Sequence, residues 1–141
     1  MAARSSTGGV HAVGFFDEFS PGWGFPTDGP IEDAVRPQAG PDEDRLVSYL
    51  RDGAWIWAEM SAQRDVLDCD GPTLVGAGSL RTDGIWIWRE DLPYYVATYH
   101  LALPDEFVAR ARELSYVPPE VPESTLIQIL TRDLRVPMAS S

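Results

Sequence analysis

Hydrophobic and polar residues alternate in several short stretches of the chain, and the clearest pattern occurs twice. The hexapeptide Asp-Gly-x-Trp-Ile-Trp covers residues 52–57 and again residues 83–88. In an extended strand, side chains two positions apart lie on the same face of a sheet. The repeat therefore predicts two strands, each with its two tryptophans on one face. These are Trp55 and Trp57 in the first copy and Trp86 and Trp88 in the second.

Four indole rings left in water would expose a large apolar surface, because each ring buries about 150–250 Å² when it packs. We therefore expect these tryptophans to form part of the core. The alternative is a partly open aromatic face of the sheet that binds a ligand, since large exposed apolar patches commonly mark binding sites.

Further strands are expected where short apolar stretches lie between turn residues. The predicted strands cover residues 10–16, 54–60, 73–81 and 85–88, the first of them at a sheet edge. Thr82-Asp83-Gly84 joins the last two as a hairpin, because an Asp-Gly turn between two apolar stretches is a strong hairpin signal. Residues 61–72 are polar and end in turn residues, so we expect them to be irregular.

Helices are predicted by apolar residues spaced three and four apart. The first begins at Pro41-Asp42-Glu43-Asp44 and ends at Gly53, the second has Asp91 placed to cap it, and the third begins at Pro104-Asp105-Glu106. Residues 123–134 are predicted as a last helix, with a strand as the alternative.

A few antiparallel strands followed by consecutive helices indicate an α+β fold. We expect a small antiparallel sheet with two or three helices packed on it, in a single domain over residues 1–141. Residues 17–41 hold five prolines and four glycines and are predicted to be an irregular loop. Its large aromatic residues need an apolar surface, which argues against simple disorder, and long irregular loops are uncommon unless they are functional.

Charge then limits the classes of partner. The chain has a net charge of −11, from 22 acids against 11 basic residues, and every basic residue is an arginine. Nucleic acid and anionic membranes are disfavoured as partners, because both bind through an excess of basic residues. The absence of lysine also excludes Schiff-base chemistry and a P-loop. The expected partner is a basic protein.

Cys69 is the single cysteine, so the chain cannot form an internal disulfide. This fits a reducing compartment, and we expect the cytoplasm. Residues 1–16 contain one basic residue and no apolar stretch long enough for a signal peptide or a membrane span.

No catalytic or cofactor site is predicted. Cys69 and His100 could be written as a nucleophile and its base, but Asp68 and Asp70 flank the thiol and disfavour its ionised form. The carboxylates of Asp65, Asp68 and Asp70 do not match the spacing of a calcium-binding loop and are interpreted as a turn cluster. We therefore predict no metal, no cofactor and no enzymatic activity.

Three motifs carry a family resemblance. They are Leu80-Arg81-Thr82-Asp83-Gly84-Ile85-Trp86-Ile87-Trp88, Leu92-Pro93-Tyr94-Tyr95-Val96 and Leu103-Pro104-Asp105-Glu106-Phe107-Val108. Together they resemble small, uncharacterised actinobacterial proteins with a Thr-Asp-Gly-x-Trp-x-Trp hairpin, and the resemblance covers residues 42–119. Arg89 stands where that group would have proline. Small acidic proteins of this kind are often immunity partners of polymorphic toxins, which is an analogy and not a motif.

The functional expectation is a non-enzymatic acidic interaction protein, most plausibly an immunity-type inhibitor that binds a basic toxin domain. Interface cores favour aromatic residues, so the predicted contacts lie in the loop and beside it. They are Asp17, Glu18, Phe19, Trp23, Phe25, Asp42, Glu43 and Asp44. The alternatives are a small-molecule-binding module that uses the aromatic face of the sheet, and a structural or regulatory protein.

Overall fold

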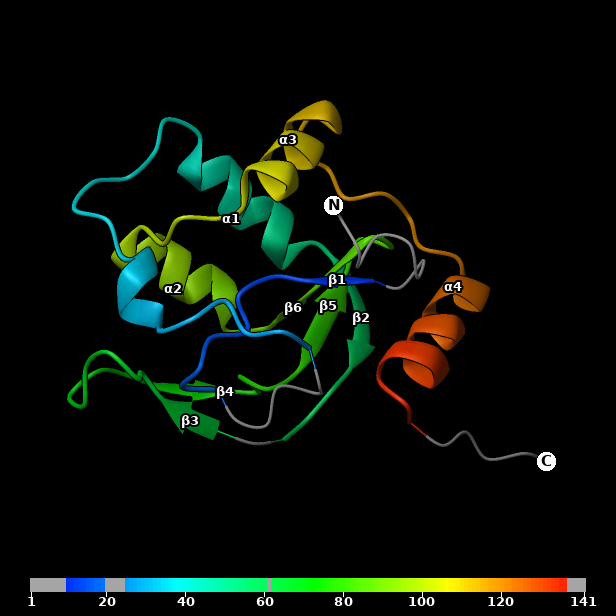
Figure 1. Ribbon diagram of the computed structural model, residues 1–141, viewed down its shortest axis with the longest axis horizontal. Coiled ribbons are helices and arrows are strands. Elements are labelled where there is room, and N and C mark those ends of the chain that lie inside the picture. The colour runs from blue at the N-terminus through cyan, green and yellow to red at the C-terminus, as the bar shows by residue number, and fades with distance from the viewer. Residues whose placement is uncertain (1–9, 20–24, 61, 137–141) are drawn as a thin grey trace.

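A four-stranded sheet forms the centre of the protein, in a computed structural model that describes residues 10–19, 25–60 and 62–136 (Figure 1). Its strand order is β1-β6-β5-β2. The strands are β1 (His11–Ala12), β2 (Ala54–Trp57), β5 (Leu80–Thr82) and β6 (Trp86–Arg89). β5 is antiparallel to both of its neighbours, whereas β1 is parallel to β6. The α+β prediction is confirmed, and the sheet is mixed because a long connection lets β1 join it in parallel.

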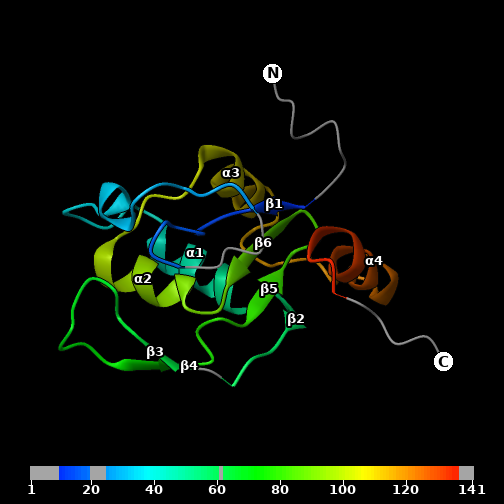
Figure 2. The same cartoon turned by 60° about the horizontal axis from the view of Figure 1, so that its bottom comes forward.

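Helices cover both faces of this sheet. Figures 1 and 2 show α1 (Glu43–Arg51), α2 (Leu92–Tyr99) and α3 (Asp105–Glu113) on one side. On the other side lies α4 (Glu123–Gln128), which continues into the π-helical turn η3 (Ile129–Asp133). None of the described helices is long and apolar enough to cross a membrane.

Two apolar clusters follow from this layered arrangement. The cluster on the α1–α3 side contains Trp86, Trp88 and Tyr49 around Phe107. The Phe107 ring is nearly perpendicular to all three, with ring centroids 5.5–5.7 Å apart. The second cluster lies under η3 and includes Phe15, Leu80, Ile87, Ile129 and Leu134. The protein is therefore a single domain in which both faces of the sheet are covered by apolar side chains.

The predicted hairpin is confirmed, but the strand predicted at 73–81 is two strands. β5 and β6 pair across the Asp83-Gly84 turn, with Thr82 opposite Ile87. Residues 73–75 form β4 (Thr73–Val75), which pairs with β3 (Ala62–Arg64) in a separate two-stranded sheet. A turn closed by a hydrogen bond from the Ser79 N–H to the Gly76 carbonyl separates β4 from β5. The prediction that residues 61–72 are irregular is wrong for β3, whose side chains lack the expected apolar alternation.

The first predicted strand, residues 10–16, is shorter than expected. β1 lies at the sheet edge as predicted, but Gly14 has a φ of +79° and diverts the chain after two paired residues. Of the predicted loop 17–41, the described part is irregular except for the 3-10 turn η2 (Ile31–Ala34). The Asp28 carboxylate accepts the N–H groups of Gly14 and Phe15, which fastens this loop to the end of β1.

The helices begin and end near their predicted positions. Glu43 and Asp44 lie in the first turn of α1, where acids complement the helix dipole, and the helix ends before Gly53. Asp91 precedes α2, but its carboxylate makes no capping bond and instead accepts two bonds of 3.1 Å from Arg89. The capping interpretation of Asp91 is therefore wrong, because the buried Arg89 guanidinium takes its carboxylate.

The two tryptophan pairs lie in different environments. Trp86 and Trp88 share the face that packs on α1 and α3, as predicted. In β2 the register with β5 shifts between Trp55 and Trp57, so that Trp55 lies opposite Arg81 and Trp57 opposite Leu80. A bulge of this kind adds a residue and reverses the side-chain alternation beyond it. The prediction that Trp55 and Trp57 share one face is therefore wrong.

Candidate functional site

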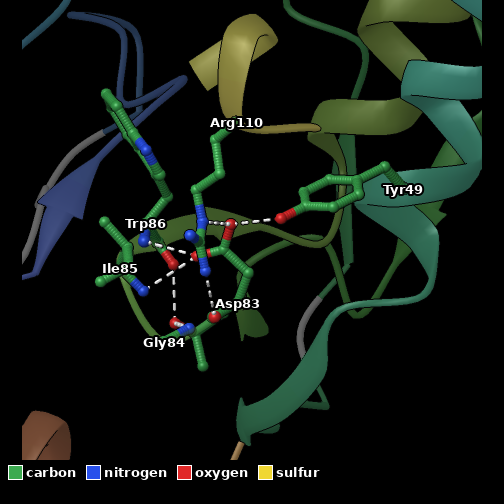
Figure 3. A network of polar contacts seen from close by, with 7 residues as sticks. Tyr49, Asp83, Gly84, Ile85, Trp86 and Arg110 are labelled. Carbon is green, nitrogen blue, oxygen red and sulfur yellow. Dashed lines mark hydrogen bonds and ion pairs between the residues drawn. The ribbon is translucent and has the colours of Figure 1, made fainter. Parts of the chain in front are cut away.

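Asp83 is the centre of a buried polar network that joins the β5–β6 turn to two helices (Figure 3). Its Oδ2 accepts hydrogen bonds from the Tyr49 hydroxyl at 2.5 Å and from Arg110 Nε at 2.9 Å. Its Oδ1 accepts the backbone N–H groups of Ile85 and Trp86 at 2.9 and 2.7 Å. Asp83 is only 1% exposed. Four protein donors occupy the two oxygens of this carboxylate, so the network is structural and has no place for a ligand.

The network sets the positions of α1 and α3 on the sheet. Tyr49 comes from α1 and Arg110 from α3, and both reach the same carboxylate oxygen. Burial and the hydrogen bond to Asp83 raise the pKa of Tyr49 far above its ordinary value, so its hydroxyl remains a donor at physiological pH. These two helices also form walls of the candidate binding site.

That site is a cavity of about 260 Å³ between α1, α2 and α3. Its apolar lining consists of Leu46, Val96, Leu101, Leu103 and Val108, and its charged lining consists of Arg36, Asp42, Glu43, Asp105 and Arg112. Concave sites with an apolar lining and a few convergent polar groups are the usual form of small-molecule sites. This combination makes the cavity the strongest candidate site among the residues that the structure describes.

Asp42 and Arg112 form one charged pair of the cavity. Arg112 donates to both carboxylate oxygens of Asp42, at 2.8 and 3.3 Å, and the Tyr116 hydroxyl adds a bond of 2.7 Å. The Arg112 hydrogen bond lowers the pKa of Asp42 to about 2, against the opposing effect of burial. Asp42 therefore stays ionised, and it occupies the fork of the Arg112 guanidinium.

Glu43, His100 and Arg36 form the second charged group. Glu43 is buried, and its carboxylate lies 3.0 Å from His100 Nδ1 and 4.0 Å from the Arg36 guanidinium. Arg36 Nε also donates to the His100 carbonyl at 2.7 Å. His100 ends α2 in the left-handed conformation, with φ of 58°. The group therefore ties the loop before α1 to the end of α2.

The predicted partner contacts do not form one surface. Phe19 and Glu43 are buried, since Phe19 packs under Arg89 and Glu43 binds His100. Phe25 packs against Phe15 with ring centroids 5.3 Å apart. Trp23 lies outside the described residues. Asp17, Glu18 and Asp44 are exposed, and Asp42 is half-buried.

The exposed contacts also divide into two places. In Figure 1 the chain that follows β1 and the start of α1 lie on opposite sides of α2. The chain after β1 does meet η2, because the Asp17 N–H donates to the Gly29 carbonyl at 2.9 Å and the Ile31 N–H donates to Glu18 Oε1 at 3.0 Å. This brings Asp17 and Glu18 near the exposed Glu32 and Asp33. We call these four residues the acidic loop patch.

The four tryptophans predicted to form a core or a ligand-binding aromatic face differ in their burial. Trp88 is fully buried and Trp86 is 7% exposed, so the core interpretation holds for this pair. Trp57 packs with the cluster beneath η3. Trp55 is 50% exposed, and the Arg81 guanidinium stacks on its ring at 3.8 Å.

The turn cluster around Cys69 holds the second sheet onto α2. The Asp65 carboxylate accepts hydrogen bonds of 2.6 Å from both Tyr94 and Tyr99. Burial opposes the ionised form of Asp65, but these hydrogen bonds outweigh it and lower its pKa. Cys69 is exposed, and the described residues contain no group of three or more potential metal ligands.

Sequence reasoning found two of the charged residues of the cavity and missed the others. Asp42 and Glu43 were predicted as partner contacts, whereas Arg36 and Arg112 lay in no motif and Asp105 lay in a motif to which no site was assigned. Asp42 and Arg112 are 70 positions apart, and His100 and Glu43 are 57 apart. Periodicity relates neighbours along one element, so it gives no signal for such pairs.

Comparisons with known proteins identify no relative, so the function has to be inferred from the geometry of the structure. No protein-family model, curated protein or solved structure matches the chain significantly.

Proposed function

We propose that the protein is a non-enzymatic binding protein that recognises a cationic protein through the acidic loop patch. An immunity-type inhibitor of a basic toxin domain is the form of this function that we favour. The observation that carries the proposal is the distribution of charge: six of the described arginines are paired with acids of the protein itself, and many of the surplus acids lie on its surface.

Ion pairs neutralise many of the arginines. The pairs are Arg36–Glu43, Arg81–Glu90, Arg89–Asp91, Arg110–Asp83, Arg112–Asp42 and Arg132–Asp133. Each pair cancels one positive and one negative charge, so the remaining residues carry the whole surplus of −11. Charge of one sign at the surface accelerates association with an oppositely charged partner.

Hydrogen bonds and buried apolar residues hold the acidic loop patch in place. Its two halves are far apart in sequence but are joined by the hydrogen bonds Asp17 N–H to Gly29 and Ile31 N–H to Glu18. The apolar residues beneath it, Phe16, Phe19 and Ile31, are buried. A preorganised acidic surface loses less conformational entropy on binding than a flexible one.

The test begins with capture of the tagged protein's partner from host lysate at low salt, followed by binding measurements with the purified partner. The double variant Asp17→Arg/Asp33→Arg should weaken binding at least tenfold, chiefly through slower association. The matched control Asp70→Arg/Glu113→Arg makes the same change in net charge at exposed acids elsewhere and should weaken binding less than threefold.

Equal losses in the two double variants would place the partner outside the acidic loop patch. Affinity that does not change between about 50 and 300 mM salt would contradict the electrostatic basis of the proposal, because salt at these concentrations screens exposed charges.

A further inference from the structure

We propose that the cavity between α1, α2 and α3 binds a small organic cation with an apolar body, and that Asp105 is its counter-ion. The site is separate from the acidic loop patch, so it does not depend on the proposed protein partner.

The apolar lining provides a place for the body of such a ligand. Leu46 comes from α1, Val96 from α2 and Val108 from α3, and Leu101 and Leu103 come from the connection between α2 and α3. A cavity of about 260 Å³ is just below the range of roughly 300–1,000 Å³ that holds drug-sized molecules. The ligand should therefore be smaller than these, with a short branched or aromatic group on the charged nitrogen.

The charged residues of the cavity indicate the sign of the charge on the ligand. Arg112 already holds Asp42 through two hydrogen bonds, at 2.8 and 3.3 Å. Arg36 already donates to the His100 carbonyl and lies 4.0 Å from Glu43. An anionic ligand would compete with the Asp42 carboxylate for Arg112 and would lie beside the Glu43 carboxylate at Arg36.

Asp105 differs from the other acids of the cavity. Among the described residues none forms an ion pair or a side-chain hydrogen bond with its carboxylate, whereas Asp42 and Glu43 each have basic partners. The acids of the lining outnumber its arginines by this one residue. One positive charge on the ligand would therefore complete the charge balance of the site, and its apolar body would displace water from the leucine and valine side chains.

Asp105 also lies in the first turn of α3, where an acid stabilises a helix without any ligand. The neighbouring residue Glu106 provides a control that distinguishes these two roles. Like Asp105, it lies in the first turn of α3 and is exposed, but it does not line the cavity. A role confined to the helix dipole predicts similar effects of Asp105→Asn and Glu106→Gln, whereas a ligand site predicts an effect on binding at Asp105 alone.

The experiment measures binding of four probes to the full chain by calorimetry and ligand-observed NMR. Two are cations, 3-methylbutylamine and 2-phenylethylamine. The other two keep the first apolar body but change the charge: 3-methylbutanol is neutral and 3-methylbutanoate is anionic. We expect saturable binding of at least one amine, about tenfold or more tighter than the alcohol, since hydrogen bonds to charged groups are the stronger ones. The anion should not bind.

Variants then place the binding site. Asp105→Asn should weaken amine binding about tenfold or more and bring it close to that of the alcohol, while Glu106→Gln should leave it within twofold. Val108→Phe should fill the cavity and abolish binding. Circular dichroism and thermal unfolding of each variant show whether it remains folded.

The proposal is overturned if neither amine binds saturably, if the alcohol or the carboxylate binds as tightly as the amine, or if Asp105→Asn and Glu106→Gln act alike. Amine binding that survives Val108→Phe in a folded variant would also overturn it, because the ligand would then lie elsewhere.

Discussion

At the scale of single residues, the two copies of the Asp-Gly-x-Trp-Ile-Trp hexapeptide need their glycines for different reasons. Gly84 has a φ of +96°, and a Cβ there would meet little beyond a Val121 methyl group at 3.9 Å. A Cβ on Gly53 would lie 2.5 Å from the Trp88 ring. That ring is fully buried, and its Nε1–H donates to the Leu50 carbonyl at 2.9 Å. Gly84 is thus required by backbone conformation and Gly53 by close packing.

Gly53→Ala should therefore lower the free energy of unfolding by roughly 1–3 kcal/mol through overpacking. Gly84→Ala should lower it by roughly 1–2 kcal/mol through backbone strain. Denaturant unfolding in the wild-type and Trp88→Phe backgrounds distinguishes the two causes. The smaller ring should relieve the cost of Gly53→Ala and leave that of Gly84→Ala unchanged, and equal costs in both backgrounds would refute the packing explanation.

At the scale of elements, Asp83 connects a turn of the sheet with α1 and α3. One carboxylate oxygen receives the two backbone N–H groups of its own turn, and the other receives Tyr49 and Arg110. A buried carboxylate with this many donors stabilises the fold only while every partner is present. The helix layer and the hairpin should therefore lose stability together when the second oxygen is replaced.

Asp83→Asn places an amide N–H₂ opposite either the Tyr49 and Arg110 donors or the backbone N–H groups. We expect a loss of roughly 2–4 kcal/mol, because buried donors are left without an acceptor. Asp52 is the corresponding residue of the first hexapeptide and is exposed, so Asp52→Asn is a matched control that should stay within about 0.5 kcal/mol. Comparable losses for the two variants in chemical denaturation would contradict the assigned role of Asp83.

Asp42 connects the start of α1 to the end of α3 and should make this contact sensitive to acid. Its pKa is lowered from the usual 3.8 to about 2. Between these values the unfolded chain binds more protons at this group than the folded protein does, so stability is lost as the pH falls from about 4 to 2.

The comparison with Asp42→Asn isolates this contribution, since the other acids titrate in both proteins. Wild type should be the more stable of the two at pH 5, and its advantage should shrink as the pH is lowered to about 2. Unfolding free energies measured across this range provide the check. A difference that stays constant with pH would show that the Asp42–Arg112 pair does not contribute through ionisation.

At the scale of the whole molecule, repulsion among surface acids opposes the compact state. A net charge far from zero destabilises a folded protein, and salt screens this repulsion. Here the Arg89–Asp91 and Arg110–Asp83 ion pairs lie within the fold, whereas many of the surplus acids are exposed, as in the acidic loop patch.

Raising sodium chloride from about 10 to 300 mM should therefore increase the melting temperature by a few degrees. Potassium chloride should have the same effect, because screening depends on ionic strength and not on the cation. The variant Asp17→Arg/Asp33→Arg should gain less from salt than wild type. A melting temperature that falls with salt would mean that the internal ion pairs outweigh the surface repulsion.

Some elements of the fold are determined by short sequence patterns, whereas others depend on contacts between distant segments. The Asp83-Gly84 hairpin and the helices α1, α2 and α3 follow from turn residues and apolar spacing over a few residues. β3 has no such pattern. Its position depends on pairing with β4 and on the hydrogen bonds from two tyrosines of α2 to Asp65, which follows β3. The bulge between Trp55 and Trp57 arises from pairing with β5. The cavity depends on contacts between distant segments, and so only its individual residues, not their arrangement, could be predicted.

The two edge strands of the central sheet have a consequence for contact between molecules. β1 pairs over only two residues, and β2 is interrupted by its bulge. Exposed edges can recruit strands from other chains and start aggregation, and short or irregular edges oppose this recruitment. The irregularity that reversed the side-chain alternation in β2 therefore also protects the sheet, and restoring a regular β2 should make the protein more prone to assemble into β-rich aggregates.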